Sequence, residues 1–443
     1  MNKKICVYAI AKNEIKFIDR WYNSVKEADY VCVLDTGSTD GSFEKFTSLG
    51  IICEQRTYKP FRFDIARNDS LKLIPKDAEI CVCVDIDEFF VPGWSNILRS
   101  AWHENVGRAR YRYTWNFNPD GSEGVVYMAD KIHKNGYFHW QHPVHEVLVK
   151  NQPHIDTVNN TGKNHIKSIK TAHNSTNKNH TSAANQDATI DTTESTQNLI
   201  TIDLPNIQLN HMADNFKSRA SYLPLLELSV KENPTDDRNM HYLAREYMFH
   251  GEYKKAIQTF EKHLSLPTAI WQAERSASLR YIANCYKQLG ALKKQIQNKH
   301  IKNNKNINFD ETIDNKSENL IKNHTNNYYF NKQIEYLYKA ILEYPSTREP
   351  YYELALAYFE NNQFLHSAIW FNQMLNITKR ELNYMSSPVC WGSLPYDYLS
   401  MCYYNLKDYK NAYIAVSKAL SFGEDTRLRN NQKIFAALVN RKN

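Results

Sequence analysis

The feature that most constrains the fold is a series of four short, apolar segments within the first 84 residues. They cover residues 5–10, 30–34, 51–54 and 80–84. Stretches with helical spacing separate them, at about 14–27, from about 42, and at about 64–74. Apolar strands that alternate with helices predict a parallel sheet covered by helices on both faces. Ligands of such sheets bind beyond the carboxyl ends of the strands, so the residues that follow each strand are candidates for a binding site.

The second half of the chain has another pattern, which repeats with a length of about 34 residues. One copy reads Leu243-Ala244-x-x-Tyr247, then Tyr253-x-x-Ala256-x-x-x-Phe260, with Pro267 beyond. Further copies lie at 282–290 continuing with Ala340 and Pro345, at 351–368, and at 396–419. This is the spacing of tetratricopeptide repeats. An ordinary helical bundle is the alternative, but it does not explain why Gly or Pro ends the copies.

The two patterns divide the 443 residues into an α/β domain over 1–213 and an all-α tetratricopeptide-repeat domain over 214–443. Two segments, 157–200 and 294–327, break the patterns, because Asn, Thr, Ser, Lys and His dominate them without periodic apolar positions. Such segments bury too little apolar surface to offset the entropy lost on ordering. We therefore expect both to be disordered insertions.

Composition excludes several classes of protein. The formal net charge of +7 is modest, and lysines of the two insertions supply much of it, so nucleic-acid binding is not indicated. No apolar run is long enough to span a membrane, and the start of the chain runs directly into a strand pattern, without the features of a signal peptide. Cys6, Cys32, Cys81 and Cys83 lie within the apolar strands. They are expected to be buried free thiols of a cytoplasmic protein.

Polar motifs follow the predicted strands. They are Ala11-Lys12-Asn13-Glu14, the turn Asp35-Thr36-Gly37-Ser38-Thr39-Asp40-Gly41-Ser42, Phe63-Asp64-Ile65-Ala66-Arg67-Asn68, and Asp85-Ile86-Asp87-Glu88. Acids at buried strand ends are costly unless they bind a cation or a hydrogen-bond donor. Asp85 and Asp87 suit a hard divalent cation that keeps open positions for diphosphate oxygens.

In this order and spacing, the motifs resemble those of family-2 glycosyltransferases with the GT-A fold. The stretch 63–68 and Val144-His145-Glu146 are similar to a subgroup fused to tetratricopeptide repeats, which includes peptide S-glycosyltransferases of bacteriocin pathways. The resemblance covers 1–150 and 202–290 well, and the remaining repeats more loosely. It implies a nucleotide-sugar donor and Mn²⁺ or Mg²⁺ as cofactor.

The resemblance also implies roles for single residues. Asp35 would accept the pyrimidine N–H of a uridine-type nucleotide, and Arg67 would contact the base or a phosphate. Asp85 would reach the ribose or a metal-bound water, and Asp87 would bind the metal directly. Glu14 would line the same pocket near the ribose.

Three further residues complete the expected site. Glu146 occupies the place of the family's general base, which deprotonates the acceptor, and His145 would orient it or contact the diphosphate. His211 resembles the late histidine that completes the metal site in some relatives; a purely structural role for it is the alternative. A zinc site among the histidines of 136–146 would lack the usual Cys/His spacing.

The expected function is that of a metal-dependent glycosyltransferase, a hexosyltransferase that acts with inversion on a UDP-linked sugar. The acceptor, a peptide, protein or glycan, would bind the repeats, and the chain can form a homo-oligomer. The first alternative is a non-catalytic repeat scaffold with a degenerate nucleotide-binding domain. A nucleotidyltransferase is the second, but a glycine-rich phosphate loop near the N-terminus is missing.

Overall fold

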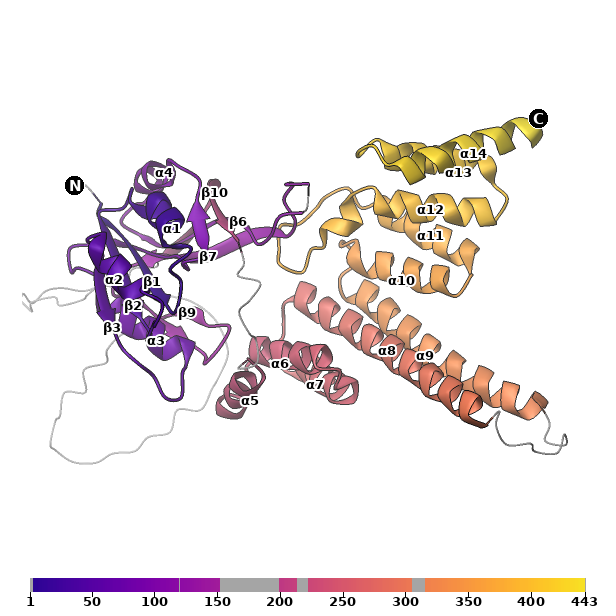
Figure 1. Cartoon of the computed structure of the whole chain (residues 1–443), viewed down its shortest axis with the longest axis horizontal. Helices are drawn as coiled ribbons and strands as arrows, with labels where there is room; N and C mark the ends of the chain where they lie inside the picture. The colour runs from indigo at the N-terminus through magenta and orange to yellow at the C-terminus, as the bar shows by residue number, and fades with distance from the viewer. Residues whose placement is uncertain (1–2, 119, 152–198, 213–221, 305–314, 443) are drawn as a thin grey trace, which may run out of the picture.

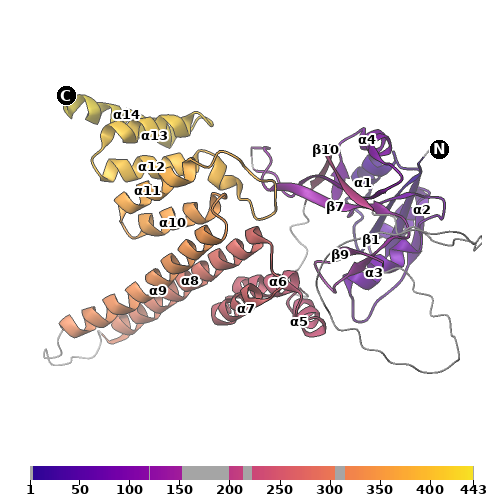
Figure 2. The ribbon, with the colours of Figure 1, turned by 180° about the vertical axis from the view of Figure 1, so that it is seen from behind.

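The computed structural model describes residues 3–118, 120–151, 199–212, 222–304 and 315–442 (Figure 1). The first three ranges form an α/β part and the last two a helical part. A turned view shows that the hairpin of β6 (Val106–Thr114) and β7 (Val126–Lys134) extends from the α/β part toward the helices (Figure 2). Rings of Tyr127 on this hairpin and Tyr384 in the helical part lie 6.2 Å apart between their centroids.

The α/β part is built on an eight-stranded sheet with the order β3-β2-β1-β4-β7-β6-β10-β5. Its strands are β1 (Ile5–Ala11), β2 (Tyr30–Asp35), β3 (Ile52–Gln55), β4 (Ile80–Cys83), β5 (Glu88–Phe90), β6 (Val106–Thr114), β7 (Val126–Lys134) and β10 (Ile200–His211). The pairs β3–β2, β2–β1 and β1–β4 are parallel. These are the four strands predicted from the apolar segments, and the prediction is confirmed.

Beyond β4 the sheet is mixed, which the sequence analysis does not anticipate. Strand β7 pairs antiparallel with both β4 and β6, β10 pairs parallel with β6, and β5 runs antiparallel to β10. A separate pair is formed by β8 (Phe138–Gln141) and β9 (Val147–Lys150). The register places His211 at the end of β10 opposite Glu88 of β5. Two distant segments therefore meet at one edge of the sheet.

Helices cover both faces of the parallel strands, as expected. On one face, α1 (Ile18–Val25) and α2 (Ser42–Ser48) pack against the parallel strands, and on the other face α3 (Phe63–Leu71) does so. The helix α4 (Trp94–Ala101) packs against β10 instead. Because side chains alternate along a strand, Val7 and Val82 pack on one face, and the four strand cysteines pack on the other with Tyr8 and Trp140. Cys6, Cys32, Cys81 and Cys83 are free and fully buried, which confirms their assignment to the core.

The helical part consists of paired helices with a tetratricopeptide-like arrangement. Its elements are α5 (Tyr222–Glu232), α6 (Asp237–Phe249), α7 (Tyr253–Ser265), α8 (Gln272–Asn304), α9 (Asn315–Glu343), α10 (Glu349–Glu360), α11 (Phe364–Leu375), α12 (Leu394–Asn405), α13 (Tyr409–Leu420) and α14 (Thr426–Lys442). The pairs α6–α7, α8–α9, α10–α11 and α12–α13 correspond to the four predicted repeats. Ala244, Ala256 and Phe260 are buried between helices, as the repeat pattern requires.

The two segments expected to be disordered have different outcomes. The first, 157–200, lies outside the described residues except at its end, where Ile200 begins β10. In the second, residues 294–304 and 315–327 are helical, since they continue α8 and α9, and 305–314 lie outside the described residues. Gly290 lets the two helices approach closely, because a Cβ there would lie 3.0 Å from the Cβ of Tyr329. The expected domain boundary at 213 also lies outside the described residues.

Among the described helices, none is both long and apolar enough to cross a membrane.

Candidate functional site

The turn after β2 holds Asp35 in a defined orientation. Its Oδ1 accepts hydrogen bonds from the backbone N–H groups of Gly37 (2.9 Å) and Ser38 (2.8 Å) and from Gln55 Nε2 (3.0 Å). The side chain is fully buried, and its Oδ2 has no hydrogen-bond partner among the described residues. A buried carboxylate oxygen without a donor is costly, so this atom suits a ligand N–H or O–H.

The motifs after β1 and β2 fold onto each other. Asn13 has a left-handed backbone, with φ of 57°, and its side-chain oxygen accepts the N–H of Thr39 at 2.8 Å. The N–H of Glu14 donates to Ser42 Oγ at 2.9 Å. Glu14 is 6% exposed and lies at the same strand-end edge as Asp35, as expected.

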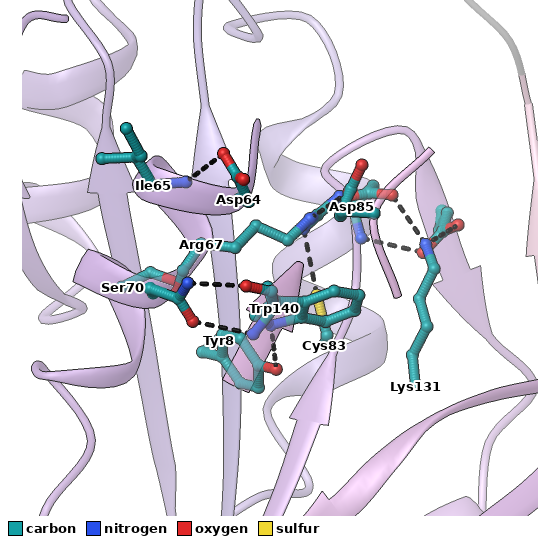
Figure 3. A network of polar contacts seen from close by, with 12 residues as sticks. Tyr8, Asp64, Ile65, Arg67, Ser70, Cys83, Asp85, Lys131 and Trp140 are labelled. Atoms are coloured by element: carbon teal, nitrogen blue, oxygen red, sulfur yellow. Dashed lines mark hydrogen bonds and ion pairs between the residues drawn. The ribbon is translucent and has the colours of Figure 1, made fainter. Parts of the chain in front are cut away.

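Asp85, which follows β4, is surrounded by cations (Figure 3). Arg67 Nη2 donates to its Oδ1 and Lys131 Nζ donates to its Oδ2, each at 2.8 Å. Burial opposes ionisation, but these two cations hold the pKa of Asp85 below its usual range. Each carboxylate oxygen of Asp85 therefore has a cationic partner within the chain.

Lys131 is a site residue that the sequence analysis missed. It lies on β7, where the register pairs Ile132 with Val82 and so brings Lys131 beside the end of β4. Its ammonium group also donates to Glu88 Oε1 at 3.3 Å. The partner carboxylate is 46 residues away in the sequence, and no motif marks the lysine, so only the strand pairing shows the contact.

Glu88, the last acid of the same motif, is buried within the sheet. It accepts hydrogen bonds from the backbone N–H of Asp85 (2.8 Å) and from the hydroxyl of Tyr113 (2.7 Å). Burial raises the pKa of Glu88, and the negative charge of Asp85 raises it further although Lys131 opposes this. These contacts give Glu88 a role in holding the Asp85–Asp87 turn.

Asp87 and His211 form the pair that could hold a divalent metal. His211 Nε2 lies 3.6 Å from Asp87 Oδ2, and both side chains are only partly exposed, at 10% and 15%. His211 Nδ1 contacts the carbonyl oxygen of Trp115 at 2.8 Å, and the ring stacks on Trp115 with 4.5 Å between centroids. An imidazole nitrogen fixed through its other nitrogen, next to a carboxylate, is a suitable donor set for Mn²⁺.

Arg67 is buried and joins two predicted site residues. Its Nη2 contacts Asp85, its Nε donates to Glu146 Oε1, and its Nη1 lies 3.0 Å from Cys83 Sγ. The guanidinium also lies over the Trp140 ring, 5.1 Å from the centroid. Burial opposes its charge, but the two carboxylates raise the pKa of Arg67 above its usual value. The structure thus places Arg67 in an internal ion-pair network. Its guanidinium group contacts both Asp85 and Glu146, the candidate base, and so links the two carboxylates.

His145 faces the helical part. Its ring stacks on Tyr242 of α6, with 3.9 Å between centroids and 14° between planes, and its backbone φ is 52°. The preceding Val144 packs against Leu226 of α5. His142 Nε2 lies 3.2 Å from Asp236 Oδ2 at the start of α6. The first helices of the repeat region therefore support the loop that carries Glu146.

The histidines of 136–146 do not form a three-ligand metal cluster in the part of the chain that the structure describes. The group of three metal-ligating side chains found there lies elsewhere, at His241, His263 and Glu274.

Comparisons with known proteins concern the repeats. No protein-family model matches the chain, and no curated protein matches it. Among solved structures, MamA is 15% identical over 45% of this chain and 85% of its own, with a TM-score of 0.30. The tetratricopeptide-repeat protein TTC0263 of Thermus thermophilus is 16% identical over 49% of this chain and 88% of its own, with a TM-score of 0.30. The first tetratricopeptide-repeat domain of human RPAP3 is 12% identical over 27% of this chain and 87% of its own, with 0.22.

Proposed function

We propose that this chain is a metal-dependent glycosyltransferase, which transfers a sugar from a UDP-linked donor to a peptide, protein or glycan acceptor. The observation that carries the proposal is the buried Oδ2 of Asp35, which lacks a partner among the described residues. It lies at the carboxyl end of β2, where ligands of parallel sheets bind. The N3–H of uracil is a donor that would satisfy this oxygen, and the family resemblance assigns it the same task.

Asp87 and His211 would hold Mn²⁺ or Mg²⁺, because they offer one oxygen and one nitrogen 3.6 Å apart at the same edge of the sheet. A bound divalent cation supplies positive charge to a diphosphate leaving group. Asp85 would contribute through hydrogen bonds to the ribose or to metal-bound water. Arg67 and Lys131 hold its carboxylate in place.

Glu146 would act on the acceptor. It accepts the proton of the attacking hydroxyl or thiol while the acceptor forms its bond to the anomeric carbon and the bond from that carbon to the diphosphate breaks. A single displacement of this kind inverts the anomeric centre. The stacking of His145 on Tyr242 supports this division of labour, since it couples the base-bearing loop to the repeats that would hold the acceptor.

The competing function is a repeat scaffold whose α/β part no longer binds nucleotide. Incubation of the purified chain with UDP-, GDP- and dTDP-sugars in the presence of Mn²⁺ or Mg²⁺ distinguishes the transferase from the scaffold. We expect metal-dependent release of UDP from one or more UDP-sugars and little release from the others. A chain that neither binds UDP by calorimetry nor hydrolyses any donor would refute the transferase and favour the scaffold.

A further inference from the structure

Three metal-ligating side chains converge where α6 and α7 of the first repeat pack against α8 of the second. His241 comes from α6, His263 from α7 and Glu274 from α8, with exposures of 0%, 0% and 3%. One ligand atom of each lies within 4.8 Å of the ligand atoms of the other two. Three helices therefore direct a potential metal-binding group to one buried point.

The hydrogen bonds of this cluster leave ring nitrogens unsatisfied. Ser278 Oγ lies 2.7 Å from His241 Nδ1 and 3.0 Å from His263 Nδ1, so one hydroxyl group is hydrogen-bonded to both rings. The Nε2 atoms of both histidines are buried and have no hydrogen-bond partner among the described residues. Buried polar atoms without a partner are uncommon, because each costs about 1–3 kcal/mol.

The spacing between His263 and Glu274 fits a shared metal better than a direct bond. His263 Nε2 lies 3.4 Å from Glu274 Oε1 and does not meet hydrogen-bond geometry. A charge-assisted hydrogen bond would be about 2.7–2.9 Å long. Two ligands of a tetrahedral zinc ion, each about 2.0–2.1 Å from the metal, lie roughly 3.4 Å from each other.

The hydrogen bonds of Glu274 leave one of its carboxylate oxygens open to a metal. The Tyr384 hydroxyl donates to Oε2 at 2.7 Å, which leaves Oε1 for another ligand.

Two cations lie near His241. The guanidinium groups of Arg238 and Arg245 both lie over the Tyr242 ring, at 5.1 and 5.2 Å from its centroid. The aromatic face offsets part of their positive charge.

We propose that His241, His263 and Glu274 bind one Zn²⁺ ion, which joins α6 and α7 of the first repeat to α8 of the second. In this arrangement Ser278 Oγ would accept the Nδ1–H of both rings and hold them with Nε2 toward the metal, because a hydrogen bond to one ring nitrogen orients a metal-binding histidine. The order Glu274, His263, Ser278 also resembles a hydrolytic triad, but Ser278 is fully buried and cannot meet a substrate. The ion would fix the helix that carries Tyr242, the neighbour of His145.

Zinc binding by the full-length chain tests the proposal. The measurement is made in an Asp87→Ala background, so that the strand-end site does not contribute and the result does not depend on the proposed transferase. After dialysis against a chelator, competition with a chromophoric zinc chelator gives stoichiometry and affinity. We expect one Zn²⁺ per chain with a Kd below about 1 µM, and an absorption spectrum of tetrahedral Co²⁺ when cobalt replaces zinc.

Three variants locate the site. His263→Gln should weaken zinc binding at least 100-fold, whereas Ser278→Ala, which keeps the ligands, should weaken it about 10- to 100-fold. His250→Gln is the matched control, because His250 ends the same helix as His241 but its side chain is 45% exposed. Unchanged zinc affinity in His263→Gln, or an equal loss in His250→Gln, would overturn the assignment. If His263→Gln does not fold, the measurement on the Asp87→Ala chain alone is used, and absence of bound zinc in that chain overturns the proposal.

Discussion

The replacement of Asp35 by Asn tests the donor site with little disturbance of the fold. The side-chain oxygen of asparagine can take the place of Oδ1 and accept the same three donors, two backbone N–H groups and Gln55 Nε2. The amide NH₂ then takes the place of Oδ2, which lacks a partner among the described residues. The substitution thereby changes the acceptor that would face the nucleotide into a donor, and the side-chain volume is nearly unchanged.

The expected loss follows from one hydrogen bond. A hydrogen bond to a charged group contributes about 1.5–3 kcal/mol. Since about 1.4 kcal/mol corresponds to a tenfold change in Kd, UDP should bind Asp35→Asn roughly 10- to 150-fold more weakly. Cytosine has an acceptor at N3, to which the new amide can donate, so CDP should not lose affinity and can gain it. The preference for UDP over CDP should therefore shrink or reverse.

Isothermal titration with UDP and CDP in saturating Mn²⁺ measures both affinities, and circular dichroism checks the fold. Asp19→Asn is a suitable control, because this acid lies on α1 with a side chain 70% exposed. If Asp35→Asn binds UDP within twofold of the parent chain, or weakens UDP and CDP equally, Asp35 does not contact the base and the donor-site reasoning is refuted.

Three further predictions concern other parts of the α/β domain. Asp87→Ala should abolish turnover and weaken Mn²⁺-dependent UDP binding; calorimetry that gives equal UDP affinity with metal, with chelator and in the variant would contradict the metal assignment. Glu146→Gln should keep UDP binding, since its amide oxygen can still accept from Arg67, while transfer falls about 10²- to 10⁴-fold, or less for a thiol acceptor; a parental transfer rate would place the base elsewhere. Asp29 accepts the N–H of Ile5 (2.7 Å) and forms an ion pair with Arg99 (2.8 Å). Its replacement by Asn should therefore lower the free energy of unfolding near neutral pH by about 1–2 kcal/mol. Burial opposes the ionisation of Asp29, but these contacts lower its pKa below the usual 3.8. The stabilisation is therefore present above the unfolded-state pKa and is lost as the pH falls through the folded-state pKa. If urea unfolding gives the same free-energy difference between parent and variant at about pH 3 as at neutral pH, the ion pair is not its cause.

Local patterns in the sequence are sufficient to predict much of the fold. Apolar segments that suit a doubly covered sheet predict β1 to β4, and small and large residues at repeat spacing predict the helix pairs from α6 to α13. The acids at strand ends are also local features. Their meeting at one edge follows from the parallel register, which pairs Ala11 with Asp35 and Asp35 with Gln55.

The pairing of these acids is decided only by the tertiary structure. Lys131 reaches Asp85 because β7 inserts antiparallel beside β4, and His211 reaches Asp87 because β10 runs against β5. The same is true of His241, His263 and Glu274, whose three helices direct one side chain each to a common point. A sequence motif records neighbours along the chain, whereas an ion pair or a metal site depends on distances of a few ångströms between segments that only packing brings together.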